Sequence, residues 1–279
     1  MVRPRIAVCF FGITRSLSHT IASIEANVLA PARQQGEVTV LSHFFEQTQI
    51  DNPRSGEAGT LNTQEHKLLP NDWLELEPPG TGLDQWGFEE LKQHGDRWSD
   101  DFRSLRNLMQ QQHSLHRVTD AALKTDPDLV IFCRPDLHYH DSFEDQIARG
   151  LKDVWPTVRL PSWQPWIGRN DRFAIARGQR AVRAYGQRVE LAQEYCRWRE
   201  EPLHAEKLVA YALRRHFVRV KTFPLRASRV RISGERVDEV FTPPHWRATL
   251  PETLRRRARF VALKTGMLKF VPSGLRRGS

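Results

Sequence analysis

The chain of 279 residues lacks any apolar run of about eighteen residues, the length that a membrane-spanning helix needs. An apolar stretch near the N-terminus, residues 6–11, is too short for the core of a secretory signal and ends without a small-residue cleavage site. We therefore expect residues 6–11 to belong to the first strand of the fold, and the protein to remain in the cytoplasm.

Cysteine is also scarce. The chain has three, Cys9, Cys133 and Cys196, an odd number without the spacing of a zinc site or a disulfide framework. Cys9 and Cys133 lie within apolar runs, where cysteine packs as a small hydrophobic side chain. We expect all three to be inert, as in a reducing compartment. No Ser–His–Asp or Cys–His combination at a recognisable spacing indicates nucleophilic catalysis.

Excess positive charge is missing from most of the chain. The formal net charge is +9, but residues 246–279 hold nine basic residues against the single acid Glu252 and account for +8 of it. Nucleic-acid binding depends on neutralising phosphates with Lys and Arg, so the near-neutral residues 1–245 argue against a nucleic-acid partner. We interpret residues 1–245 as one domain and residues 246–279 as a basic tail.

The apolar residues that are present predict an α/β fold. A β-branched and aromatic run at 5–11, a helical pattern at 17–29 and a second strand at 37–45 form a strand–helix–strand unit. Residues 47–100 are polar, with Pro and Gly clusters, and predict a long, partly irregular insertion. The other predicted elements are helices at 101–124, 143–151, 177–201 and 203–217, and strands at 129–133, at both ends of 157–176 and at 218–224. Such an order predicts a mainly parallel central sheet flanked by helices.

The first predicted strand ends in FFGITRSL, residues 10–17, ahead of a helix. Ligands of parallel α/β sheets bind at the C-terminal ends of strands. Gly12 permits close backbone approach, and Arg15 can bind a phosphate with two hydrogen bonds. The segment has neither the Gly-Lys-Ser/Thr of a Walker loop nor the repeated glycines of a dinucleotide fingerprint. We expect Gly12, Thr14 and Arg15 to contact a phosphate or nucleotide; the alternative is an ordinary tight turn.

A second polar group follows a buried strand in LVIFCRPDLHYHD, residues 129–141. Asp136 and His138 offer an oxygen and an imidazole nitrogen to a divalent cation. Arg134 can neutralise a diphosphate, and the topology places all three on the same sheet edge as Arg15. We expect a metal at Asp136 and His138; the alternative is a solvated polar loop in which Arg134 pairs with Asp136.

A third group lies in SWQPWIGRNDRFAIA. Trp163 and Trp166 have flat faces that suit the C–H groups of a sugar. Asn170, Asp171 and Arg172 follow them and can hydrogen-bond to hydroxyl groups. We expect a sugar-binding loop with Asp171 deep in the pocket; the alternative is that the tryptophans fill the core.

The order of these motifs resembles that of nucleotide-sugar-dependent glycosyltransferases of the GT-A type, in particular bacterial enzymes of surface-polysaccharide assembly. The resemblance spans residues 5–222 and includes the strand–Gly–x–x–Arg opening, SLHRV in a long helix, RPDL after a strand, NDRFAIA and an Ala-Glu helix start. It implies a Rossmann-like GT-A domain over residues 1–245. The implied activity is that of a hexosyltransferase, which moves a sugar from a nucleoside-diphosphate sugar to a glycan or lipid-linked acceptor.

The resemblance also implies roles for single residues. Those beside the nucleotide are Gly12, Thr14 and Arg15. RPDL stands where GT-A enzymes carry an Asp-x-Asp motif, so Asp136 matches its first acid while His138 replaces its last. The diphosphate would be neutralised by Mn2+ or Mg2+ on Asp136 and His138, or by Arg134 without metal.

Two carboxylates are implied on the acceptor side. Asp171 would lie at the sugar, and Glu206, in the Ala-Glu helix start, would line the acceptor. Either could accept the proton of the acceptor hydroxyl. Without the resemblance, Glu206 is a residue that compensates the dipole of its helix.

The basic tail suggests a membrane partner. Its apolar residues Leu254, Ala258, Val261, Thr265 and Leu268 share one helical stripe, with the arginines opposite. A basic amphipathic helix fits the anionic inner face of the cell membrane, where lipid-linked acceptors reside. The alternative is a tail that packs on the domain or is disordered.

Two other functions stay open at this point. FFGITRSLSHT loosely resembles the phosphosulfate-binding strand–loop–helix of sulfotransferases, although the usual Lys is missing. A non-catalytic carbohydrate-binding protein would also use the tryptophans and the polar loop. The sulfotransferase would bind adenosine 3′,5′-bisphosphate, which distinguishes it from the glycosyltransferase hypothesis.

Overall fold

The computed structural model describes residues 2–52, 56–165 and 167–242. The chain divides into two units, Met1–Phe241 and Thr242–Ser279. The predicted tail at 246–279 and Trp166 lie outside the described residues. The membrane-binding helix and the sugar contact of Trp166 therefore stay predictions.

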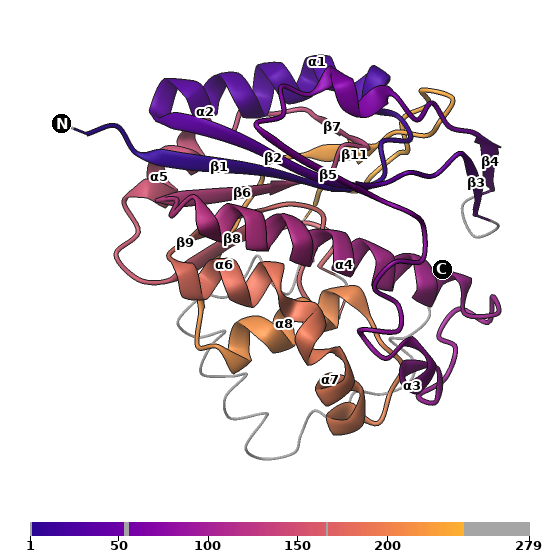
Figure 1. The fold of residues 1–279 in the computed structure, drawn as a ribbon. Helices are drawn as coiled ribbons and strands as arrows, with labels where there is room; N and C mark the ends of the chain where they lie inside the picture. Colours follow the sequence, from indigo (N-terminus) through magenta and orange to yellow (C-terminus); the bar gives the residue numbers. More distant parts are fainter. Residues whose placement is uncertain (1, 53–55, 166, 243–279) are drawn as a thin grey trace. The chain divides into compact units, whose positions relative to one another are not determined.

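A seven-stranded sheet runs through the first unit in the order β10-β8-β9-β6-β1-β2-β5 (Figure 1). Its strands are β1 (Arg5–Gly12), β2 (Glu37–Phe45), β5 (Trp73–Glu77), β6 (Leu129–Cys133), β8 (Thr157–Pro161), β9 (Ala174–Arg177) and β10 (Arg219–Phe223). β9 pairs antiparallel with β6 and β8, and the other neighbours pair in parallel. The structure thus confirms an α/β fold with a mostly parallel central sheet.

Helices cover both faces of this sheet (Figure 1). On one face lie α1 (Leu17–Ile24), a π-helical segment (Glu25–Leu29), α2 (Ala30–Gln35) and α5 (Glu144–Leu151). On the other face lie α4 (Arg103–Lys124), α6 (Gln179–Gly186) and α8 (Ala205–Arg215). Beyond α4 and α8, α3 (Phe88–Lys92) and α7 (Ala192–Arg199) contact each other. No helix among the described residues is both long and apolar enough to span a membrane.

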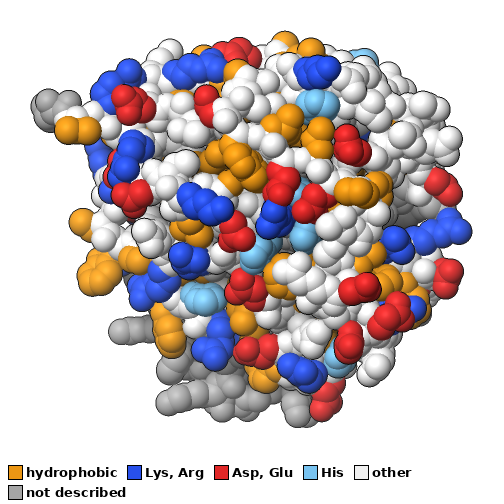
Figure 2. Space-filling model, in the orientation of Figure 1, with side chains coloured by type: hydrophobic (Ala, Val, Ile, Leu, Met, Phe, Trp, Pro, Cys, Tyr) orange, Lys and Arg blue, Asp and Glu red, His pale blue; other side chains and the backbone are white. Residues whose placement is uncertain are grey.

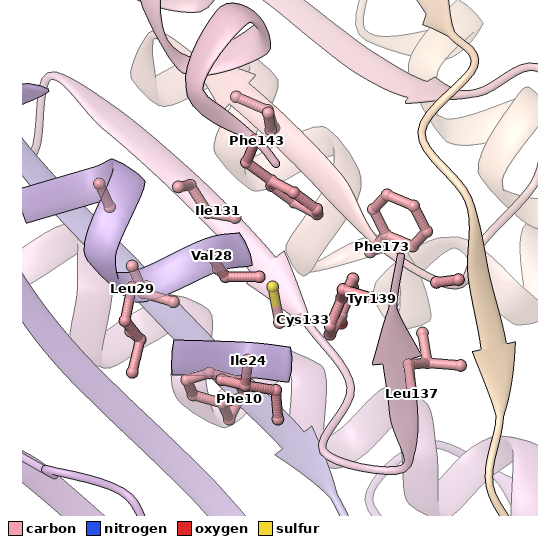
Figure 3. Close-up of a cluster of buried hydrophobic side chains, with 14 of the residues drawn as sticks. Phe10, Ile24, Val28, Leu29, Ile131, Cys133, Leu137, Tyr139, Phe143 and Phe173 are labelled. Carbon is pink, nitrogen blue, oxygen red and sulfur yellow. The ribbon is translucent and has the colours of Figure 1, made fainter. Parts of the chain in front are cut away.

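The central strands contribute to two apolar cores, one on each face. In β1, Val8 and Phe10 pack in one cluster with Ile24 of α1 (Figure 3). The next residue along, Cys9, points to the opposite face and joins the cluster that contains Leu115 of α4. Because strand side chains alternate between faces, a strand buried on both sides is a continuous apolar run. This is why β1 and β6 were predictable.

All three cysteines are buried free thiols; burial was expected for Cys9 and Cys133. Burial raises the pKa of Cys133 and that of Cys196 to about 12. Both therefore stay protonated at neutral pH, and a protonated thiol is a poor nucleophile and metal ligand.

The insertion predicted at 47–100 contributes a strand to the central sheet. β5 pairs in parallel with β2 and forms one edge of the sheet. Its sequence WLELE alternates over only five residues, and an edge strand needs no continuous apolar run. The same segment forms the antiparallel hairpin of β3 (Gln49–Asn52) and β4 (Glu57–Thr60).

Two further short strands were not predicted. β7 (Leu137–Tyr139) and β11 (Ala227–Arg229) pair antiparallel outside the central sheet. Three residues are too few to show a strand period. The helix predicted at 177–201 is instead divided into α6, a 3-10 segment (Arg188–Leu191) and α7.

The direction of strand addition reverses between β1 and β6. From β1 the sheet grows through β2 and β5 on one side, and the chain then returns to place β6 on the other side of β1. In open α/β sheets, ligands bind outside the C-terminal ends of the two strands at such a reversal. Here those ends are Gly12 and Cys133.

Phe143→Ala should lower the free energy of unfolding by about 3–5 kcal/mol, because it leaves a cavity among aromatic rings. Phe143 is fully buried, and its ring centroid lies 5.4 Å from those of Tyr139 and Phe173 (Figure 3). Chemical denaturation measures the loss. Phe217→Ala, at a side chain that is 85% exposed, is the control and should change little. Similar losses in both variants would contradict this packing.

Candidate functional site

Two arginines from different strand ends converge on one buried carboxylate. Arg15, after β1, donates from Nη2 to Asp136 Oδ2 at 2.5 Å. Arg134, after β6, donates from Nε to Asp136 Oδ1 at 2.9 Å and from Nη2 to Oδ2 at 2.7 Å. The structure therefore brings together three of the predicted site residues at the reversal point of the sheet.

The Asp136 carboxylate stays ionised in this position. Burial alone would raise its pKa, but the charges and hydrogen bonds of Arg134 and Arg15 hold the pKa of Asp136 well below its ordinary value. The pairing of Arg134 with Asp136 matches one alternative from the sequence. The side chain of Asp136 is only 3% exposed, however, so this is not a solvated loop.

The β3–β4 hairpin adds a second carboxylate that the sequence did not indicate. Glu57 Oε2 accepts hydrogen bonds from Arg15 Nη1 at 2.9 Å and from Arg231 Nη1 at 3.2 Å. Its Oε1 accepts one from the Ile232 backbone at 2.9 Å. Glu57 lies in a polar segment without periodicity, and nothing short-range marks it as buried. Three guanidinium groups against two carboxylates leave this cluster positive, which favours an anionic ligand.

The geometry favours the metal-free alternative at Asp136. Both of its oxygens are already bound by guanidinium groups, which oppose a cation there. His138 lies on β7, opposite Ser228 of β11, with its ring centroid 4.9 Å from that of His140. A metal at Asp136 and His138 stays a prediction.

Gly12 has the conformation that close ligand approach requires. Its φ of 110° lies in the region that favours glycine, and a Cβ atom added there would meet nothing within 4 Å. Its N–H donates to Ser114 Oγ at 2.8 Å. Thr14 closes the turn through its carbonyl, which accepts from the Leu17 N–H at 3.3 Å.

The tryptophan-rich loop is held by its own polar residues. Asn170, 2% exposed, donates from Nδ2 to the Trp163 carbonyl at 3.0 Å and accepts from the Arg172 N–H at 3.0 Å. Trp163 is fully buried, and its indole N–H donates to the Leu225 carbonyl at 2.7 Å. Trp163 therefore has the core-filling role that was the alternative, and Asn170 holds the loop in shape.

The same loop brings Asp171 into the electrostatic range of the arginine cluster. Burial and the charge of Glu206 raise the pKa of Asp171, while the charges of Arg188, Arg134 and Arg172 oppose the rise. Three other segments, which carry Arg134, Arg188 and Glu206, therefore lie within electrostatic range of this carboxyl group. A carboxyl with a raised pKa is a candidate for proton transfer.

Glu206 approaches the loop from the first turn of α8. Its Oε2 lies 2.9 Å from His204 Nδ1, and against the effect of burial this partner lowers the pKa of Glu206. Its carbonyl accepts from the Arg169 N–H at 2.9 Å. A Cβ atom at Gly168 would lie 2.1 Å from that carbonyl oxygen, so only glycine allows this close contact. Arg172, in the same loop, pairs with Glu239 at 2.6 Å.

Arg188 is a further member that the sequence did not indicate, because it falls within a predicted helix. It is 1% exposed and donates from Nη1 to the Tyr185 carbonyl at 2.6 Å. Its Nε and Nη2 have no hydrogen-bond partner among the described residues. A buried guanidinium with free donors, whose charge acts on Asp171, is suited to bind a ligand oxygen.

No protein-family model matches this chain, and no match is found among curated proteins. The functional interpretation therefore depends on the chemistry of the residues above.

Asp136→Asn should lower the free energy of unfolding by about 3–5 kcal/mol, because it leaves the Arg134 guanidinium without its counter-charge and leaves Arg15 with Glu57 alone. Asp141→Asn is the matched control, because Asp141 also pairs with an arginine, Arg226, but at the surface. We expect the control to cost about 1 kcal/mol or less. Urea denaturation of both variants is the measurement. Equal effects would show that Asp136 is not an essential counter-ion.

Proposed function

We propose that this protein is a glycosyltransferase of the GT-A type, which moves a hexosyl group from a nucleoside-diphosphate sugar to a glycan or lipid-linked acceptor. The observation that carries the proposal is the pair Arg15 and Arg134, both bound to buried Asp136 at the reversal point of the sheet. This is the position in which α/β proteins bind nucleotides. The bacterial polysaccharide context and the membrane-bound tail are part of the same proposal.

The arginine pair suits a diphosphate leaving group. When the bond between the sugar C1 and the diphosphate oxygen breaks, negative charge develops on the diphosphate. Guanidinium groups already fixed by Asp136 can neutralise this charge without reorganising. Arg15 Nε has no hydrogen-bond partner among the described residues, and Arg134 Nη1 has only a 3.4 Å contact with Gln111. Donors therefore remain for phosphate oxygens.

Asp171 is suited to the other half of the reaction. The acceptor oxygen forms its bond to C1 and must lose a proton, which the Asp171 carboxylate can accept. A raised pKa makes Asp171 a stronger base than an ordinary carboxylate. Glu206 and Arg172 lie on the same side of the site as Asp171. Glu206 is the second candidate for the base.

Nucleotide binding tests the proposal directly. UDP, GDP or dTDP should raise the melting temperature in the presence of a chelator, because the arginines do not need a metal to bind the diphosphate. Arg134→Gln should weaken the affinity of the effective nucleotide by about tenfold or more, through loss of charge-assisted hydrogen bonds. Arg226→Gln, at an exposed ion pair, is the control and should leave the affinity unchanged.

Two outcomes would overturn the nucleotide site. One is that no nucleoside diphosphate shifts the melting temperature, with or without Mn2+. The other is that Arg134→Gln binds as tightly as the wild type. A shift by adenosine 3′,5′-bisphosphate alone would instead favour the sulfotransferase.

Asp171→Asn should reduce sugar transfer by about 100-fold or more while donor affinity changes little, because the base is removed. A base must be deprotonated, so wild-type kcat should fall as the pH drops through the raised pKa of Asp171. In Asp171→Asn, this decrease at low pH (the acid limb of the pH–rate profile) should be absent. Rates at several pH values, with the donor identified by the nucleotide panel, measure both effects. An unchanged acid limb in Asp171→Asn would transfer the role to Glu206.

A further inference from the structure

We propose that His43, Glu77 and His113 form a second site, which binds a divalent transition metal of the zinc class. This inference does not depend on the proposed transferase activity. The three side chains come from β2, from the end of β5 and from α4, so the fold brings them together from distant segments. Their potential ligand atoms all lie within 4.8 Å of one another.

The site lies where β5 and α4 face each other at the C-terminal edge of the sheet. Figure 2 shows acidic, basic and histidine side chains gathered on this part of the surface. His43 is fully buried and His113 is 3% exposed, whereas the Glu77 side chain is 16% exposed. Glu77 thus provides the opening through which an ion can enter.

His43 has the hydrogen bonds of a histidine prepared for metal binding. Ser114 Oγ donates to the His43 carbonyl at 2.7 Å and accepts from the Gly12 N–H at 2.8 Å. Because the only proton of Ser114 Oγ is already donated, the hydrogen bond of 3.0 Å between Ser114 Oγ and His43 Nδ1 must be donated by Nδ1–H. Such a donation to a neighbouring oxygen orients metal-bound histidines. The proton on Nδ1 leaves a lone pair on Nε2 of His43.

That lone pair faces the Glu77 carboxylate. Nε2 of His43 lies 3.3 Å from Glu77 Oε2 and has no hydrogen-bond partner among the described residues. With its proton on Nδ1, the neutral imidazole of His43 presents Nε2 as an acceptor. Two acceptors therefore face each other without a proton between them. Their separation matches the spacing of about 3.3 Å between two ligands of tetrahedral zinc with bonds of about 2.0 Å.

His113 is bound differently, and this gives the proposal its sharpest test. The indole N–H of Trp86 can only donate, so His113 Nδ1 accepts it at 3.0 Å. The ring proton then lies on Nε2, which donates to Glu77 Oε2 at 2.7 Å. To ligate through Nε2, His113 must move this proton to Nδ1 and lose the hydrogen bond from Trp86. Trp86 therefore competes with the metal.

The donor set selects the class of ion. Two imidazoles and one carboxylate suit Zn2+, Co2+ or Fe2+, whereas Ca2+ and Mg2+ prefer oxygen ligands alone. Glu75 Oε2 lies 4.0 Å from His43 Nε2 and adds negative charge, while Arg117 pairs with Glu75 and lies 3.6 Å from Glu77 Oε1. Two carboxylates against one guanidinium leave the site negative. Three protein ligands leave one position for water or a substrate atom.

Metal titration of the chelator-treated full chain tests the site without any nucleotide. Calorimetry should show one Zn2+ per chain, and Co2+ should give the visible absorption of a tetrahedral complex that Zn2+ removes. Glu77→Gln and His113→Ala should weaken binding by at least about 100-fold, more than the loss of an outer partner. His116→Gln, a neighbouring histidine of α4 outside the site, is the control.

Trp86→Phe separates this site from a purely hydrogen-bonded group. It should tighten Zn2+ binding by about fivefold, because the competing hydrogen bond of about 1 kcal/mol is removed. This variant keeps all three ligands, so it remains informative if the ligand variants fail to fold. The proposal would be overturned if neither the wild type nor Trp86→Phe bound Zn2+ or Co2+ stoichiometrically. Nucleoside-diphosphate binding should be the same in Glu77→Gln, so failure of either proposal leaves the other intact.

Discussion

The arrangement of the candidate site depends on one buried charge, the Asp136 carboxylate, and on the two guanidinium groups that hold it. A carboxylate taken out of water is stable only when paired and hydrogen-bonded, and the same is true of a buried arginine. Arg15 and Arg134 therefore have to meet Asp136. Since they follow different strands, this requirement fixes the turn after β1 against the turn after β6. Glu57 extends the constraint to the β3–β4 hairpin through Arg15.

Backbone contacts reinforce the same junction. Thr20 Oγ1, in α1, donates to the Pro135 carbonyl at 2.6 Å, and Ser16 Oγ donates to the Val230 carbonyl at 3.0 Å. The start of α1 thus ties the turn of Asp136 to the segment that carries Arg231. Gly12 introduces this helix through a turn with positive φ. Rigid support of this kind gives an electrostatic site its effect, because pre-oriented donors need no rearrangement when charge develops.

The sequence predicted the parts of this structure that depend on short-range patterns. β1, β2, β6 and α4 are long or continuously apolar, so their period was visible, and their order placed Arg15 and Asp136 on one edge. β7 and β11 are too short to show a period, and β5 is a half-exposed edge strand.

The site residues that the sequence did not indicate depend on contacts between distant segments: Glu57, Arg188 and the His43–Glu77–His113 group. No local pattern distinguishes such residues from surface charges or from an ordinary helix face. Trp163 was interpreted from its chemistry, whereas its burial follows from packing against a segment about sixty residues later.

The two carboxylates of the site show how environment divides roles between similar groups. Asp136 lies between two guanidinium groups, and its pKa is lowered despite burial. It is therefore a permanent anion that positions Arg15 and Arg134. Asp171 is also influenced by arginines, but burial and the nearby charge of Glu206 prevail, and its pKa rises. A pair of carboxyl groups whose pKa values move apart is typical of sites where one group holds charge and the other transfers a proton. The two carboxyl groups are therefore not interchangeable. The opposite shifts mean that Asp136 cannot act as the base without releasing both arginines. In the proposed transfer reaction, the proton is therefore accepted on the Asp171 and Glu206 side of the site.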